Sequence, residues 1–224
     1  MHARKLFAGL VTSAVAMSGV VLMAGPAHAV YNPDPDDPGF TPVSADLIGV
    51  GSDTTMHAMH LLGAAWNAQA PAPTFRIASY SALGGGTLPL PSGDLNRPNG
   101  SGSGKTVLYG AANNTDVDFA RSSSANSTAE NAAGLQAFPF ALDQLRMVVS
   151  GNVASNAPAN LTPAQIVDIY KGNITNWSEI PGSGAAGVIA PKTPQPGSGT
   201  RSFWDAQLKI MNGGVTVVYG GSVV

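Results

Sequence analysis

A glycine-rich turn that joins a short apolar run to a helical pattern constrains the fold of this chain most. Residues 46–50 predict a strand that runs directly into Gly51-Ser52-Asp53-Thr54-Thr55 and then into a helix over residues 56–68. Residues 187–190 predict a strand that leads through a second such turn, residues 196–201, into a helical pattern that opens at Phe203. Repeated strand–turn–helix order indicates an α/β fold with a largely parallel sheet.

The polar side chains of these turns suit a small oxyanion. Glycine lets several N–H groups point at one spot, and a helix start adds partial positive charge. Ser198 and Thr200 supply hydroxyls and Arg201 a cation; residues 100–106 and the serines after Arg121 have a similar composition. Ligands of open α/β sheets lie at the carboxyl ends of the strands, where all four turns are expected. Taken singly, each turn is equally consistent with a plain helix cap or a polar surface turn.

The first 29 residues predict a cleavable signal peptide. Arg4 and Lys5 precede an apolar run over residues 6–23, and Ala27-His28-Ala29 is a small-residue cleavage pattern. The chain of 224 residues contains no cysteine, which excludes disulfides, thiolate metal sites and a lipidated cysteine. A net charge of −2 with only 11% charged residues argues against nucleic acid as a partner.

The remaining elements follow from local signals. Thr162 as N-cap, Pro163 and Gln165 predict a helix start, and Gly172 predicts its end. Residues 30–42, rich in proline and aspartate, are expected to be a disordered lead-in. Residues 83–104, rich in glycine, proline, serine and asparagine, are expected to be a loop. Further strands are expected at residues 74–81, 117–120, 145–149 and 215–219.

These motifs together resemble the phosphate-type solute-binding proteins of bacterial ABC importers, over most of the chain after residue 29. The most specific match is the helix before Lys171, followed by Gly172-Asn173-Ile174-Thr175-Asn176-Trp177. The other matching stretches, in chain order, are Gly49-Val50-Gly51-Ser52-Asp53-Thr54, Gly100-Ser101-Gly102-Ser103-Gly104, Val117-Asp118-Phe119-Ala120-Arg121-Ser122-Ser123 and Gly197-Ser198-Gly199-Thr200-Arg201.

The resemblance implies a type II periplasmic-binding-protein fold with two α/β lobes and a dehydrated ligand between them. It implies lobe 1 at residues 43–140 and lobe 2 at residues 141–224. It also implies capture of inorganic phosphate or a similar oxyanion outside the membrane and delivery to an ABC permease, by a monomer that needs no cofactor and performs no covalent chemistry. The expected ligand contacts are Ser52, Asp53, Thr54, Ser101, Ser103, Ser123, Ser198, Gly199 and Thr200.

Three departures from the family pattern affect these expectations. The acid of the family's second loop falls at Ser123, the family arginine falls near Pro194, and family chains continue well past residue 224, so an incomplete second lobe is expected. We hypothesise that Asp53 accepts the proton of the ligand while Arg121 and Arg201 supply positive charge. A simple N-cap for Asp53, and surface or inter-lobe ion pairs for the arginines, are the alternatives.

Other functions fit the residues less well. His57 and His60 stand three apart beside Met56 and Met59, but two histidines on one helix do not complete a metal site. A P-loop needs glycine where Asn99 stands. A secreted serine hydrolase lacks a nucleophile elbow with a credible base. A secreted adhesion or structural protein that keeps the binding fold without transport remains an alternative.

Overall fold

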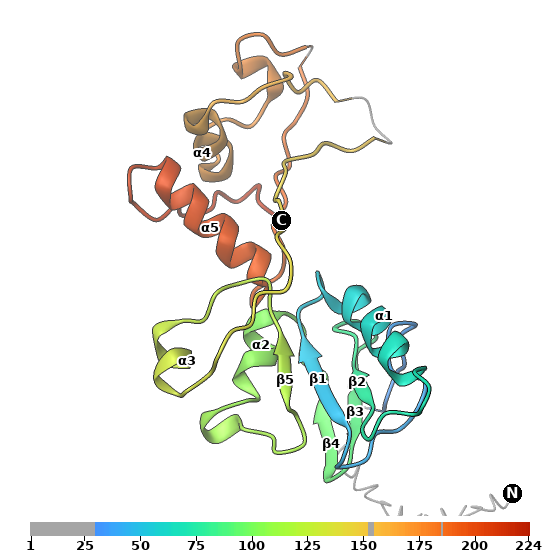
Figure 1. Ribbon diagram of the computed structural model, residues 1–224. Coiled ribbons are helices and arrows are strands. Elements are labelled where there is room, and N and C mark those ends of the chain that lie inside the picture. Colours follow the sequence, from blue (N-terminus) through green and yellow to red (C-terminus); the bar gives the residue numbers. More distant parts are fainter. Residues whose placement is uncertain (1–29, 152–154, 185) are drawn as a thin grey trace, which may run out of the picture.

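The computed structural model describes residues 30–151, 155–184 and 186–224, so the predicted signal peptide lies outside the described residues. Its elements form two parts, joined by extended chain (Figure 1). The strands are β1 (Leu47–Gly51), β2 (Ile77–Ser79), β3 (Thr87–Leu90), β4 (Gly93–Asn96) and β5 (Phe119–Arg121). The α-helices are α1 (Met56–Asn67), α2 (Ser101–Thr106), α3 (Thr128–Ala132), α4 (Pro163–Lys171) and α5 (Gly199–Met211), with 3₁₀ turns η1 (Gly110–Ala112) and η2 (Trp177–Glu179).

A three-stranded parallel sheet forms the centre of the first part, which confirms the predicted α/β fold. Its order is β2-β1-β5, and the register places Gly49 beside Ser79 on one side and Gly51 beside Arg121 on the other. Helix α2 approaches β1 so closely at Gly104 that a Cβ there would lie 2.5 Å from the Gly51 Cα. The carboxyl ends of β1 and β5 therefore lie against α2.

The loop predicted over residues 83–104 is wrong in part, because it contains the β3–β4 hairpin. Leu88 and Leu90 are buried in the same core as Ile48 and Val50, so apolar alternation outweighs the loop-like composition. A two-residue turn, Pro91-Ser92, joins the two strands.

The lead-in expected to be disordered is fixed to the first part instead. The Asp37 carboxylate is buried, pairs with Arg97 Nη1 at 2.8 Å and accepts a hydrogen bond from Ser81 N at 2.8 Å. Burial raises the pKa of Asp37, but the hydrogen bonds from Arg97 and from backbone amides outweigh burial and hold it below the ordinary value. Composition alone missed this because the ordering comes from contacts with residues distant in sequence, chief among them the buried Asp37–Arg97 ion pair.

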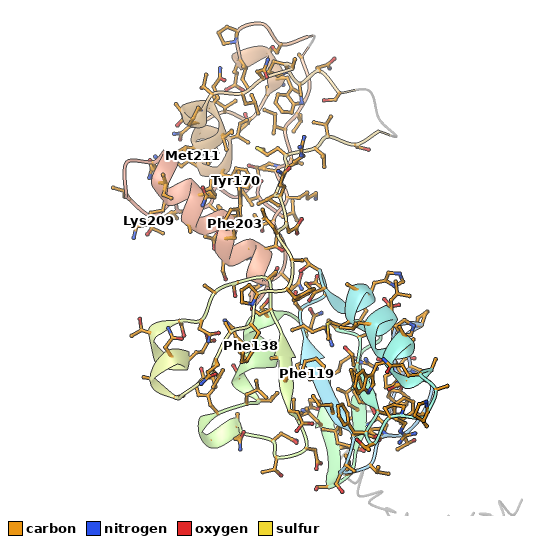
Figure 2. The ribbon with its side chains drawn as sticks, viewed as in Figure 1. Phe119, Phe138, Tyr170, Phe203, Lys209 and Met211 are labelled. Atoms are coloured by element: carbon orange, nitrogen blue, oxygen red, sulfur yellow. The ribbon has the colours of Figure 1, made fainter. Side chains whose placement is uncertain are left out.

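The second part packs α4 and α5 around a separate core. The predicted start of α4 is confirmed, with Thr162 and Gln165 forming a capping box and Gly172 ending the helix in the left-handed conformation. Tyr170, labelled in Figure 2, packs edge-on against Trp204 of α5 with ring centroids 5.3 Å apart.

The strands predicted in the C-terminal half are wrong. Residues 145–149 are extended and exposed, residues 187–190 contribute an isolated bridge between Asn176 and Val188, and residues 215–219 form no ladder. Val217 and Tyr219 nevertheless pack against the second core, while Val215 and Val218 are exposed. A strand requires a continuous hydrogen-bonded ladder, and at these positions the described residues provide only the single bridge at Val188.

Candidate anion-binding site

The turn after β1 and the turn after β5 lie side by side because the two strands are parallel neighbours. Ser52 N donates to Arg121 O at 3.0 Å, which extends the β1–β5 ladder into the turns. The hydroxyls of Ser52 and Ser123 are 3.4 Å apart, and Ser52 Oγ is 2.8 Å from Thr54 Oγ1. Two of the four predicted turns are thus in direct contact.

The start of α2 joins this pair. Ser123 N donates to Ser101 Oγ at 3.0 Å, and the two hydroxyl oxygens are 3.2 Å apart. Both Ser52 and Ser101 are fully buried. Hydroxyl groups that already lie within hydrogen-bond distance of one another can reorient toward a common acceptor.

The start of α5 completes the arrangement from the second part, as its position above α2 in Figure 1 shows. Gly102 N donates to Gly197 O at 3.1 Å, and a Cβ on Gly199 would collide with the hydroxyls of Ser101 and Ser123. Ser198 is 1% exposed, and its hydroxyl caps α5 by accepting from Arg201 N. Ser52, Ser101, Ser123 and Ser198, here called the serine cluster, therefore come from four separate turns and meet in one place.

The serine cluster lies at the N-termini of two long helices. The turn with Ser52 leads into α1, and Ser198 stands directly before α5. Free N–H groups and the helix dipoles make such ends favourable for negative charge.

Arg121 places a buried positive charge next to the serine cluster. The residue is 3% exposed; Nη1 donates to Ser79 Oγ at 2.7 Å and Nε donates to Ser52 O at 3.3 Å. Its Nη2 is buried without a hydrogen-bond partner among the described residues. Burial lowers the pKa of Arg121 to about 10, and the negative charges of Asp37, Asp36 and Asp53 offset only part of that effect. A buried guanidinium with an unused donor is suited to binding an anion.

Asp53 does not act as the N-cap of α1. Thr55 occupies the N-cap position and no side chain caps the helix, while Asp53 Oδ1 is buried without a partner among the described residues. An acceptor held in this state beside buried hydroxyls can bond a protonated ligand, since an unpaired buried acceptor is unfavourable. The N-cap alternative for Asp53 is therefore wrong.

Three other predicted contacts are placed differently. Arg201 faces the second part: Nη1 donates to Pro194 O at 3.2 Å, Nε is 4.0 Å from Asp205 Oδ2, and the guanidinium lies over the Tyr219 ring. Ser103 is exposed on α2, and Thr200 is half-buried in the first turn of α5.

Ser79 is the site residue that the sequence analysis missed. It ends β2 beside β1 and accepts the hydrogen bond of Arg121. Its position at the carboxyl end of a parallel strand is the signal that could have identified it.

The histidines considered as metal ligands face the lead-in. His57 Nδ1 is 2.9 Å from Asp36 Oδ1 and His60 Nδ1 is 3.1 Å from Asp36 O. Among the described residues no group of three or more histidine, cysteine, aspartate or glutamate side chains could hold a metal ion.

In the same part of the chain no helix has the length and apolar character needed to cross a bilayer.

Comparison with solved structures identifies the class of fold. The chain matches the crystal structure of an ABC-type phosphate transport receptor from Vibrio cholerae with a TM-score of 0.51 and 24% sequence identity. The match covers 80% of this chain and 62% of the receptor, so this chain corresponds to less than two thirds of the receptor's length. The fold is therefore α/β and of the periplasmic-binding-protein type.

The family model for the PBP superfamily domain matches residues 95–215, which is more than half of the chain. The protein belongs to this family. No curated protein matches the sequence.

Proposed function

We propose that this protein is a secreted solute-binding protein that captures a small oxyanion, inorganic phosphate, for ABC-type import. The observation that carries the proposal is the buried Arg121, whose Nη2 has no partner among the described residues. Its Nε donates to Ser52 O, in the turn whose hydroxyl lies 3.4 Å from Ser123 Oγ. An anion would satisfy the guanidinium and accept from the serine hydroxyls and the helix-end amides.

The ligand contacts that we propose come from both parts of the molecule. Residues 43–140 and 141–224 act as two lobes, and the anion lies between them at the serine cluster with Asp53, Thr54, Gly199 and Thr200. The direct contact between the α2 and α5 turns supports this assignment. Ser103 and Arg201 complete the proposed set at its rim.

Binding without covalent chemistry fits this set of groups. The site offers hydroxyls, amides and a guanidinium, which stabilise an anion without forming a bond to it. In this proposal residues 1–29 act as a signal peptide with cleavage near Ala29. The mature protein is a monomer that delivers its ligand, outside the membrane, to a permease.

Asp53 selects a protonated anion in this proposal. Its unpaired Oδ1 accepts the proton of hydrogen phosphate and repels fully ionised sulfate. Isothermal titration of the parent chain and of Asp53→Ala with both anions tests this role. We expect the parent chain to prefer phosphate by about fivefold or more, because an uncompensated buried acceptor costs about 1–3 kcal/mol. We expect Asp53→Ala to lose most of that preference.

Asp143→Ala is the matched control, since Asp143 is an exposed carboxylate in the connecting segment. Its discrimination should equal that of the parent chain. Unchanged discrimination in Asp53→Ala would refute the selective role of Asp53, and failure of the parent chain to bind either anion would refute the proposed function.

A further inference from the structure

A buried ion pair lies behind the turn that carries Ser123. Lys105 Nζ is 2.8 Å from Glu130 Oε2, and the two side chains are 7% and 9% exposed. Nζ also donates to Ala125 O at 3.0 Å and to Ser124 Oγ at 3.4 Å. All three ammonium hydrogens therefore have acceptors, and Lys105 is not free to bind an anion itself.

The Glu130 carboxylate of this ion pair is itself held in place by hydrogen bonds. Glu130 Oε2 accepts from Ser127 N at 2.7 Å while Ser127 Oγ accepts from Glu130 N at 3.2 Å, which forms the capping box of α3. Burial raises the pKa of Glu130, but the hydrogen bonds from Lys105 and Ser127 outweigh burial and hold it below the ordinary value. The carboxylate is thus charged at neutral pH and held in one orientation.

Helix α2 contacts the turn that carries Ser123 and Ser124, here called the serine turn, at two points. Ser101 and Lys105 are four residues apart and so lie on the same face of α2. Ser101 Oγ accepts from Ser123 N, and Lys105 binds the next two residues of the turn, Ser124 and Ala125. Loss of the Lys105 contacts leaves Ser101 as the one remaining described attachment of the turn to α2, beside its contact with Ser52.

We propose that the Lys105–Glu130 ion pair is a positioning device that holds the Ser123 amide and hydroxyl in the geometry needed to bind the anion. This proposal rests on the proposed function. Donors that are held in place before binding lose less conformational freedom when the ligand arrives, so the pair strengthens binding without contacting the anion.

The test compares phosphate titrations of the full chain and of Lys105→Met at a temperature where both are folded. We expect the dissociation constant to rise about tenfold, the scale on which supporting contacts act on a bound ion. We also expect faster hydrogen exchange at the Ser123 amide. The matched control is Arg76→Met, which breaks the Arg76–Asp46 ion pair at the opposite end of β1 and should leave the dissociation constant within about twofold.

The outcomes separate the two proposals. A parent chain that does not bind phosphate overturns the proposed function and this role with it. A parent chain that binds phosphate, together with a Lys105→Met variant of equal affinity, overturns the positioning role alone. Should Lys105→Met fail to fold, Glu130→Gln, which keeps the side-chain volume, decides by the same criterion.

Discussion

Arg121 is a buried cation without an ion-pair partner among the described residues. Burial lowers its pKa to about 10 from 12.5, which corresponds to roughly 3 kcal/mol against the charged form at neutral pH. A base whose pKa is lowered in the folded state destabilises the fold while it is protonated. The unfavourable contribution of Arg121 to stability therefore decreases only as the pH rises above about 10. An anion beside the guanidinium would remove the penalty at any lower pH.

Arg121→Met should therefore separate stability from binding. We expect the anion-free variant to be at least as stable as the parent chain at pH 7, because an unpaired buried charge is replaced by an apolar side chain. We expect phosphate to raise the melting temperature of the parent chain and to leave that of the variant unchanged. Thermal unfolding with and without phosphate measures both quantities; a phosphate-dependent rise of equal size in the variant would exclude Arg121 from the site.

At the scale of elements, helix ends were predictable and strands in the second part were not. The capping box at Thr162 depends on neighbours within a few residues, so the sequence contains the whole signal. The helical pattern expected to open at Phe203 begins earlier, at Gly199, because Ser198 caps α5. Residues 145–149 have a strand-like composition, but a strand also requires a partner that local sequence does not specify.

The candidate site likewise contains features that the sequence predicted and features that it could not specify. The carboxyl-end rule for parallel strands predicted that Ser52 and Ser123 would meet, and they do. The pair of Arg201 with Asp205 is local to α5 and matches the ion-pair alternative. The position of the Arg201 guanidinium over Tyr219 could not be predicted, since it depends on how α5 packs against residues 215–224. The same holds for the commitment of Lys105 to Glu130, which joins two helices distant in sequence.

Gly199→Ala tests the contact between α5 and the serine cluster. The added Cβ collides with Ser101 Oγ and Ser123 Oγ, so these hydroxyls or the start of α5 must move. We expect phosphate affinity to fall by about tenfold or more, since misplaced donors lose their hydrogen bonds, while circular dichroism still shows the helices. Gly102→Ala is the control, because its Cβ would lie at an ordinary 3.4 Å from Gly197 O. Equal affinities for Gly199→Ala and the parent chain would contradict the placement of α5.

At the scale of the whole molecule, two buried ion pairs stabilise the first part. Asp37 of the lead-in pairs with Arg97, and Glu130 pairs with Lys105 next to the serine turn. Both carboxyl groups have pKa values held below the ordinary range by these partners, despite burial. A carboxyl whose folded pKa is lowered contributes stability above its unfolded pKa and loses it as the pH falls through the folded pKa.

The melting temperature should therefore be constant from pH 7 to about pH 5 and fall steeply below about pH 4, where carboxyl groups of the unfolded chain bind protons. Arg97→Met should have a lower melting temperature at pH 7 and a shallower decrease on acidification. Differential scanning calorimetry between pH 2.5 and pH 7 measures this dependence. A melting temperature that stays level down to pH 2.5 would show that the two ion pairs add nothing to stability.

The proposed function requires that one anion is bound simultaneously by four turns that are separate in sequence. Amide chemical shifts of Ser52, Ser101, Ser123 and Ser198, followed by NMR during a titration with phosphate, measure this. We expect all four resonances to shift and to saturate with a single dissociation constant. Shifts confined to one turn, or four resonances that do not move, would contradict the proposed function.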